Sequence, residues 1–85
     1  MSMIQELIAA VTNAERQIDE QIMKLRSYTV EIDKVTERVN AAFLGSERHY
    51  DKQMMQQLTI TKTQVNDTIL RLQTAKDKLI QVRMV

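Results

Sequence analysis

Apolar residues recur at alternating steps of three and four through the first half of this 85-residue chain. This spacing is typical of a long helix that presents one narrow apolar seam to another helix. Ser2, with Gln5 three residues later, resembles a capping box, so the pattern predicts a helix over about residues 2–44. The predicted seam, in which only Gln21 is polar, consists of Ile4, Leu7, Val11, Ala14, Ile18, Gln21, Leu25, Tyr28, Ile32, Val35, Val39 and Ala42.

The second half of the chain repeats the pattern less regularly. It predicts a second helix over about residues 47–84, with a turn at 44–46. Gly45 stands where a helix C-cap favours a left-handed residue, so we expect a positive φ there, and Ser46 is a suitable N-cap for the next helix. The predicted seam positions are Met54, Leu58, Thr61, Val65, Thr68, Leu72, Ala75, Leu79 and Val82.

One short turn between two helices of similar length predicts an all-α fold. Proline is absent and glycine occurs once, so the residues that commonly turn β-strands are missing. We expect residues 1–85 to form a single domain, a coiled-coil-like hairpin of two long antiparallel helices that completes a bundle with a partner. The expected register places Ile18 near Ala75. The alternative is one continuous helix through Gly45 that pairs between chains.

The charge pattern supports the pairing of the helices and argues against several classes of partner. Residues 1–45 carry a net charge of −2 and residues 46–85 a net charge of +3, so the two halves attract each other. The whole chain carries only +1 and lacks a concentrated basic stretch, so we expect no nucleic-acid binding. The longest uncharged stretch, 53–61, is shorter than the about 20 residues of a membrane span, so we expect no membrane insertion.

The polar residues near the turn do not predict an enzyme. Ser46, His49 and Asp51 lie on consecutive turns of one exposed helix, without the pocket or the oxyanion donors that a triad requires. A zinc site needs three or four converging ligands, and the chain has no cysteine and one histidine. We therefore expect no catalytic residue, no metal site and no cofactor.

Several apolar residues fall outside the predicted seam. A hairpin that is complete by itself gains nothing from apolar side chains on its outer faces, so these residues favour a further helical protein as partner. The candidate partner-binding residues are Met23, Val30, Ile69, Leu70, Ile80 and Met84.

The turn sequence Phe43-Leu44-Gly45, followed by Ser46 and Tyr50, resembles the aromatic-x-Gly turn of the WXG family, with phenylalanine in place of tryptophan. These proteins are small helical hairpins of bacterial type VII secretion, founded on the early secreted antigenic target of mycobacteria. The chain looks closest to the accessory partners of LXG toxins. The resemblance implies a non-catalytic protein that binds the helical N-terminal domain of a larger LXG toxin and helps to target it for export.

The resemblance also implies a location and a source for the export signal. The chain starts without the basic and apolar blocks of a cleavable signal peptide, so it is expected in the cytoplasm before export and outside the cell without cleavage. The Tyr-x-x-x-Asp/Glu export motif of many such proteins has no match after Val65, so the partner is expected to supply it.

Other partners and another function fit the same pattern. The partner is expected to be the larger secreted protein, a paralogous small hairpin or a second copy in a homodimer. The alternative function is that of a general coiled-coil adaptor or structural protein that acts through helix–helix binding inside the cell.

Overall fold

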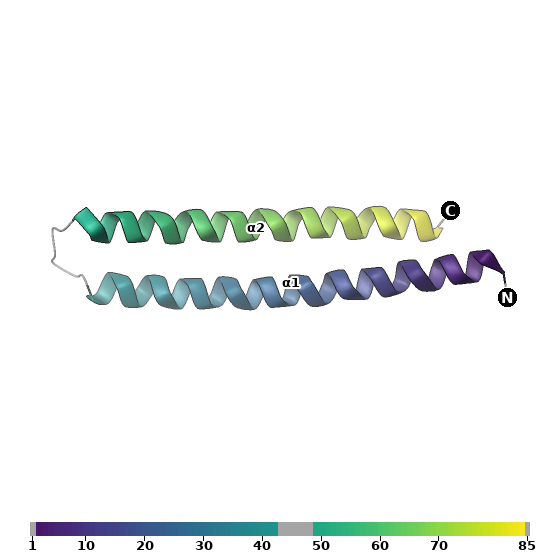
Figure 1. Ribbon diagram of the computed structural model, residues 1–85, viewed down its shortest axis with the longest axis horizontal. Helices are drawn as coiled ribbons and strands as arrows, with labels where there is room; N and C mark the ends of the chain where they lie inside the picture. The colour runs from purple at the N-terminus through teal and green to yellow at the C-terminus, as the bar shows by residue number, and fades with distance from the viewer. Residues whose placement is uncertain (1, 43–48, 85) are drawn as a thin grey trace.

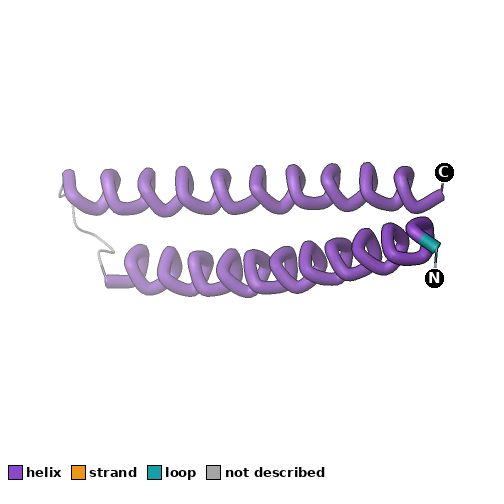
Figure 2. Tube along the Cα trace, turned by 45° about the vertical axis from the view of Figure 1, so that its right-hand side comes forward, coloured by secondary structure: helices purple, strands orange, loops and turns teal. Residues whose placement is uncertain are grey.

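A computed structural model describes residues 2–42 and 49–84, and every described residue after Ser2 is helical (Figures 1 and 2). Helix α1 spans Met3–Ala42 and helix α2 spans His49–Met84. The helices lie antiparallel with both termini at one end, in a rod of 67 × 15 × 13 Å. The predicted all-α hairpin is confirmed. The turn residues Phe43, Gly45 and Ser46, with the expected φ of Gly45, lie outside the described residues.

The start of α1 is capped as the sequence predicts. The backbone N–H of Gln5 donates a hydrogen bond of 3.2 Å to Ser2 Oγ, and the N–H of Glu6 donates one of 3.3 Å to the Ser2 carbonyl. The first bond satisfies one of the donors that the first turn of a helix leaves unpaired, and the second is the first regular hydrogen bond of the helix. The carboxylate of Glu6 also lies in the first turn, where it complements the helix dipole. The cap therefore determines where α1 begins.

The seam of α1 differs from the predicted one at several alternate positions. Gln21, Tyr28 and Val35 were expected in the seam but are exposed, and the residue after each one, Ile22, Thr29 or Thr36, lies against α2 instead. The polarity of threonine hid this arrangement. The hydroxyl of Thr29 donates to the carbonyl of Leu25 at 3.1 Å, and that of Thr36 donates to the carbonyl of Ile32 at 2.8 Å, so each hydroxyl is satisfied within α1. The threonine methyl groups remain for packing.

The seam of α2 is displaced in the same way. The predicted positions Leu58, Val65, Leu72 and Leu79 are at least half-buried, but the alternate positions fall one residue later than expected. Ile69, only 8% exposed, replaces Thr68, and its predicted place outside the seam is wrong. The other members of this second set are Met55, Lys62, Lys76 and Arg83.

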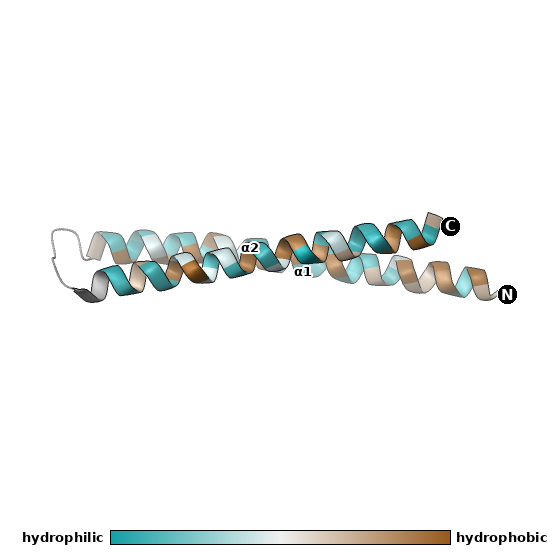
Figure 3. Cartoon of the chain, turned by 90° about the horizontal axis from the view of Figure 1, so that it is seen from above, coloured by the Kyte–Doolittle hydropathy of each residue, from teal (hydrophilic) through white to brown (hydrophobic). Residues whose placement is uncertain are grey.

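Three ion pairs between described side chains link the helices. Lys76 Nζ lies 2.8 Å from Asp19 Oδ1 and Lys62 Nζ lies 2.7 Å from Asp33 Oδ1. The third pair joins Arg83 to Glu15. The expected register placed Ile18 near Ala75. The contact of Asp19 with Lys76, the next residue in each helix, is close to this register. Seen from above, α2 passes over α1 at a shallow angle, as heptad-spaced helices do (Figure 3).

The core of the hairpin is thin. Its buried apolar residues in the described part of the chain are Val11, Ile22, Ile32 and Ile69, and none of these side chains is completely enclosed. The first turns of α1 extend past the end of α2 in Figure 1, which leaves Ile4 exposed although it was predicted in the seam. Two helices bury only one stripe each, so most of both surfaces stays available to a partner.

Candidate functional site

The ion pairs with Lys62 and Lys76 mark one flank of the hairpin, which we call the ion-paired flank. Asp19 and Asp33 each directly follow a seam residue of α1 and face the two lysines. A groove on this flank brings Arg26 of α1 together with Asn66 and Gln73 of α2. The residues that directly follow the leucine and valine seam positions of α2 therefore lie on this flank.

The opposite flank carries no charged side chain in the described residues, and we call it the uncharged face. Its residues directly precede the seam residues that the sequence pattern did not predict. They recur at every seventh position in both helices. A groove that joins Leu7 of α1 to Val82 of α2 shows that the two rows lie on the same side of the hairpin. The uncharged face consists of Leu7, Ala14, Gln21, Tyr28, Val35 and Ala42 from α1, and Met54, Thr61, Thr68, Ala75 and Val82 from α2.

The uncharged face is more apolar than its composition indicates. The hydroxyls of Thr61 and Thr68 donate hydrogen bonds of 2.9 Å to the carbonyls of Gln57 and Gln64, one turn earlier in α2. Since these bonds satisfy the hydroxyl hydrogens, the two threonines place methyl groups on the surface at little cost in hydration. Tyr28 is 56% exposed on the same face. The face thus presents apolar surface to solvent along both helices.

The uncharged face continues into an apolar groove at the end of the hairpin that carries the termini. The groove has a volume of about 420 Å³ and contains Ile4, Ile8 and Val11 besides Leu7 and Val82. Arg83 is its one charged residue. Because α1 extends past α2 here, the first turns of α1 have an apolar side without a neighbour. A helix that lies along the uncharged face would reach this groove.

The predicted partner-binding residues are distributed differently. Met23, Val30, Leu70 and Met84 are exposed, as expected, and Ile80 is half-buried, whereas Ile69 belongs to the seam. Met23 and Leu70 line grooves of the ion-paired flank, beside Arg26. Their role in partner binding stays a prediction.

Sequence reasoning missed the uncharged face because it assigned these residues to the seam. Apolar residues next to the predicted seam positions could have revealed this face. Ile8, Ile22 and Ile69 each directly follow a residue of this face, and all three fell outside the predicted seam. In α1, apolar residues and threonines therefore occupy most of three neighbouring columns, while an antiparallel pair encloses about two. In α2, one of the three columns also contains Lys62, Lys76 and Arg83. The third column is the surface that remains for a partner.

Glu15 is the one buried charged residue among the described residues, with 9% of its surface exposed. Arg83 Nε lies 3.2 Å from Glu15 Oε1, but this oxygen accepts no hydrogen bond from any described residue. The interaction is therefore electrostatic without a directed bond, which is weak compensation for the loss of hydration.

Arg83→Ala is expected to lower the free energy of unfolding by about 1–3 kcal/mol, because it leaves the Glu15 carboxylate buried without a cation. Glu15→Leu is expected to leave it unchanged or raise it. Lys34→Ala, which removes only the exposed pair with Glu31, is the control and should change it by less than about 0.5 kcal/mol. Urea denaturation measures all three. If Glu15→Leu lowered the free energy of unfolding more than Arg83→Ala does, this account of Glu15 would be contradicted.

The described residues contain no group of three His, Asp or Glu side chains placed to hold a metal ion. No described helix is long and apolar enough to cross a membrane. No known protein family, no curated protein and no solved structure matches the chain. What the geometry offers is a pair of long helices with one uncharged face, a surface suited to packing against other helices.

Proposed function

We propose that this hairpin is a non-catalytic binding protein that docks a helical partner on its uncharged face. The observation that carries the proposal is this face, which holds exposed apolar side chains and no charge along both helices. Exposed apolar surface that forms one connected area favours an interface, whereas scattered apolar residues do not. A partner helix that follows the face would turn the hairpin into a three- or four-helix bundle.

The hairpin also has an energetic reason to bind. Only four apolar side chains in the described part of the chain are buried. Chains of this size commonly depend on a metal, a disulfide or a partner for stability, and this chain has no cysteine. Burial of apolar side chains such as Tyr28, Val35 and Val82 against a partner adds core without any change in the hairpin itself.

For the partner we propose the helical N-terminal domain of an LXG toxin, with a role in its export by a type VII secretion system. The support for this finer step is the resemblance of the Phe43-x-Gly45 turn and of the hairpin length to the WXG family. A general coiled-coil adaptor would use the same face, so export is the property that separates the two functions.

Two double variants test the docking face. Tyr28→Glu with Val35→Glu places two charges on the uncharged face, where a packed interface would have to desolvate them. Val30→Glu with Leu70→Glu places two charges on exposed positions outside it and is the matched control. We expect the first pair to weaken binding of the purified N-terminal domain of the LXG toxin encoded nearest to this chain by at least about 100-fold, and the control to weaken it by less than about threefold.

Calorimetric titration gives both affinities, and circular dichroism confirms that both variants remain helical. Loss of binding in the control alone would move the docking site to the predicted residues Val30 and Leu70. Binding that neither variant weakens would contradict docking on either surface. In cells, normal export of the toxin from a strain that lacks this chain would reject the secretion role and favour the adaptor.

A further inference from the structure

Basic residues border the uncharged face. Lys24 and Arg38 each lie three residues after a member of the face in α1, and Arg71 and Lys78 do so in α2. Residues three apart are neighbours on a helix surface, so these four side chains form a rim on both long edges of the face. All four are exposed, and none forms an ion pair with another described residue.

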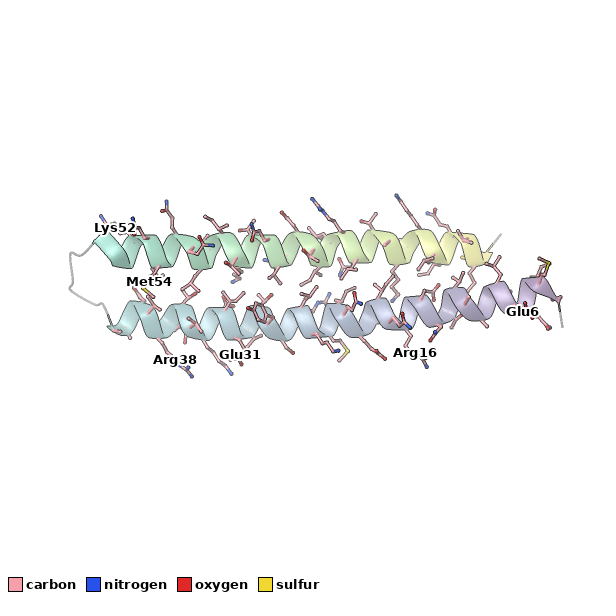
Figure 4. The ribbon with its side chains drawn as sticks, in the orientation of Figure 1. Glu6, Arg16, Glu31, Arg38, Lys52 and Met54 are labelled. Carbon is pink, nitrogen blue, oxygen red and sulfur yellow. The ribbon has the colours of Figure 1, made fainter. Side chains whose placement is uncertain are left out.

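Among the residues that lie three positions after a member of the face, Glu31 is the single acid. Its carboxylate lies 3.4 Å from Lys34 Nζ, on the side away from the uncharged face, so it is already paired within α1. Figure 4 shows Glu31 and Arg38 on the side of α1 that points away from α2, at the outer edge of the hairpin. The charge bordering the face is therefore strongly positive, although the whole chain carries only +1. Of the other described acids, Asp19 and Asp33 lie on the ion-paired flank.

We infer that the occupant of the uncharged face is a helical partner whose apolar stripe is bordered by acidic residues, and is not a second copy of this chain. A second copy placed face to face would bring basic rim against basic rim, and like charges at the edge of an interface discriminate against such a pairing. An acidic border would instead pair with Lys24, Arg38, Arg71 and Lys78. The inference rests on the docking face of the proposed function and adds the chemistry of its partner.

A charge-reversed variant of this chain serves as the acidic partner in the test. The variant K24E/R38E/R71E/K78E keeps the uncharged face and replaces its basic rim with an acidic one. We expect wild type and this acid-rim variant to form a mixed complex at low salt that is at least about tenfold tighter than the self-association of either protein. Raising the salt to about 0.5 M should weaken the mixed complex, because exposed ion pairs are screened. Sedimentation velocity measures all three associations.

The matched control is R16E/R26E/K34E/K52E, which changes the net charge by the same amount at exposed positions away from the rim. We expect this control to associate with wild type no more tightly than wild type associates with itself. The comparison shows whether the position of the acidic residues or only the net charge determines the association. If the acid-rim variant is not helical by circular dichroism, K24E/R71E gives the same comparison with an expected gain of about threefold.

A wild-type homodimer at low salt as tight as the mixed complex would overturn the inference, and so would the absence of a mixed complex. The control binding wild type as well as the acid-rim variant would also overturn it. None of these outcomes depends on a toxin. Failure of the secretion role and failure of the acidic partner are therefore distinguishable.

Discussion

Ile69→Asp is expected to unfold most of the hairpin at room temperature, whereas Leu70→Asp should leave its unfolding temperature nearly unchanged. The two residues are neighbours in the chain, but Ile69 is 8% exposed and Leu70 is 60% exposed. Truncation of a buried isoleucine alone costs about 2–5 kcal/mol, and a carboxylate in its place must also lose its hydration. The single core of so small a chain rarely supplies more than about 3–5 kcal/mol in total.

Circular dichroism during thermal unfolding measures both variants, and Thr68→Asp completes the comparison. Thr68 is the position that the sequence pattern placed in the seam, but it is exposed in the structure. If Thr68→Asp unfolded the hairpin and Ile69→Asp did not, the seam would follow the sequence pattern and the uncharged face would be part of the core.

Replacement of Lys62 and Lys76 by isoleucine should raise the free energy of unfolding by about 1–3 kcal/mol, because two more apolar side chains would be largely buried. Both lysines occupy seam positions and are half-buried, and both pair with aspartates that remain 50% exposed. Ion pairs of such exposure contribute only about 0–1 kcal/mol each. An isoleucine at the same position would instead extend the apolar seam next to Val65 and Leu72.

The stabilised variant should lose specificity at the same time. Charged residues at core positions select one register and one oligomeric state at a cost in stability. We therefore expect the Lys62→Ile, Lys76→Ile variant to form dimers or higher oligomers, which light scattering coupled to gel filtration detects. Lys34→Ile with Lys52→Ile, at exposed positions outside the uncharged face and its basic border, is the control for added apolar surface. A lower unfolding temperature in the seam variant would show that the ion pairs are a main source of stability.

The prediction of the surface was less complete than that of the fold. Val30 and Leu70 are exposed as expected, but the pattern placed Tyr28 and Val35 in the core, and they form part of the uncharged face. The error arises because the prediction counted apolar side chains. Tyr28 and Val35 are more hydrophobic than the threonines that directly follow them, so they were assigned to the seam. The hydroxyls of Thr29 and Thr36 form hydrogen bonds within their own helix, which makes the two side chains effectively less polar. A count of apolar residues does not include this effect.

The amino-acid sequence by itself favoured an antiparallel hairpin over one continuous helix. It determined the helical stretches on both sides of Gly45, the cap at Ser2 and one column of each seam, represented by Val11 and Leu58. These features depend on local propensity and on a period that each helix carries alone. Only the tertiary structure decided which neighbouring column completes the seam, and with it the burial of Ile69 and the exposure of the uncharged face. In α1, where apolar residues and threonines occupy most of three neighbouring columns, either outer column could face the other helix. The choice depends on how both helices pack together, including the pairs of Lys62 and Lys76, and is therefore a property of the pair.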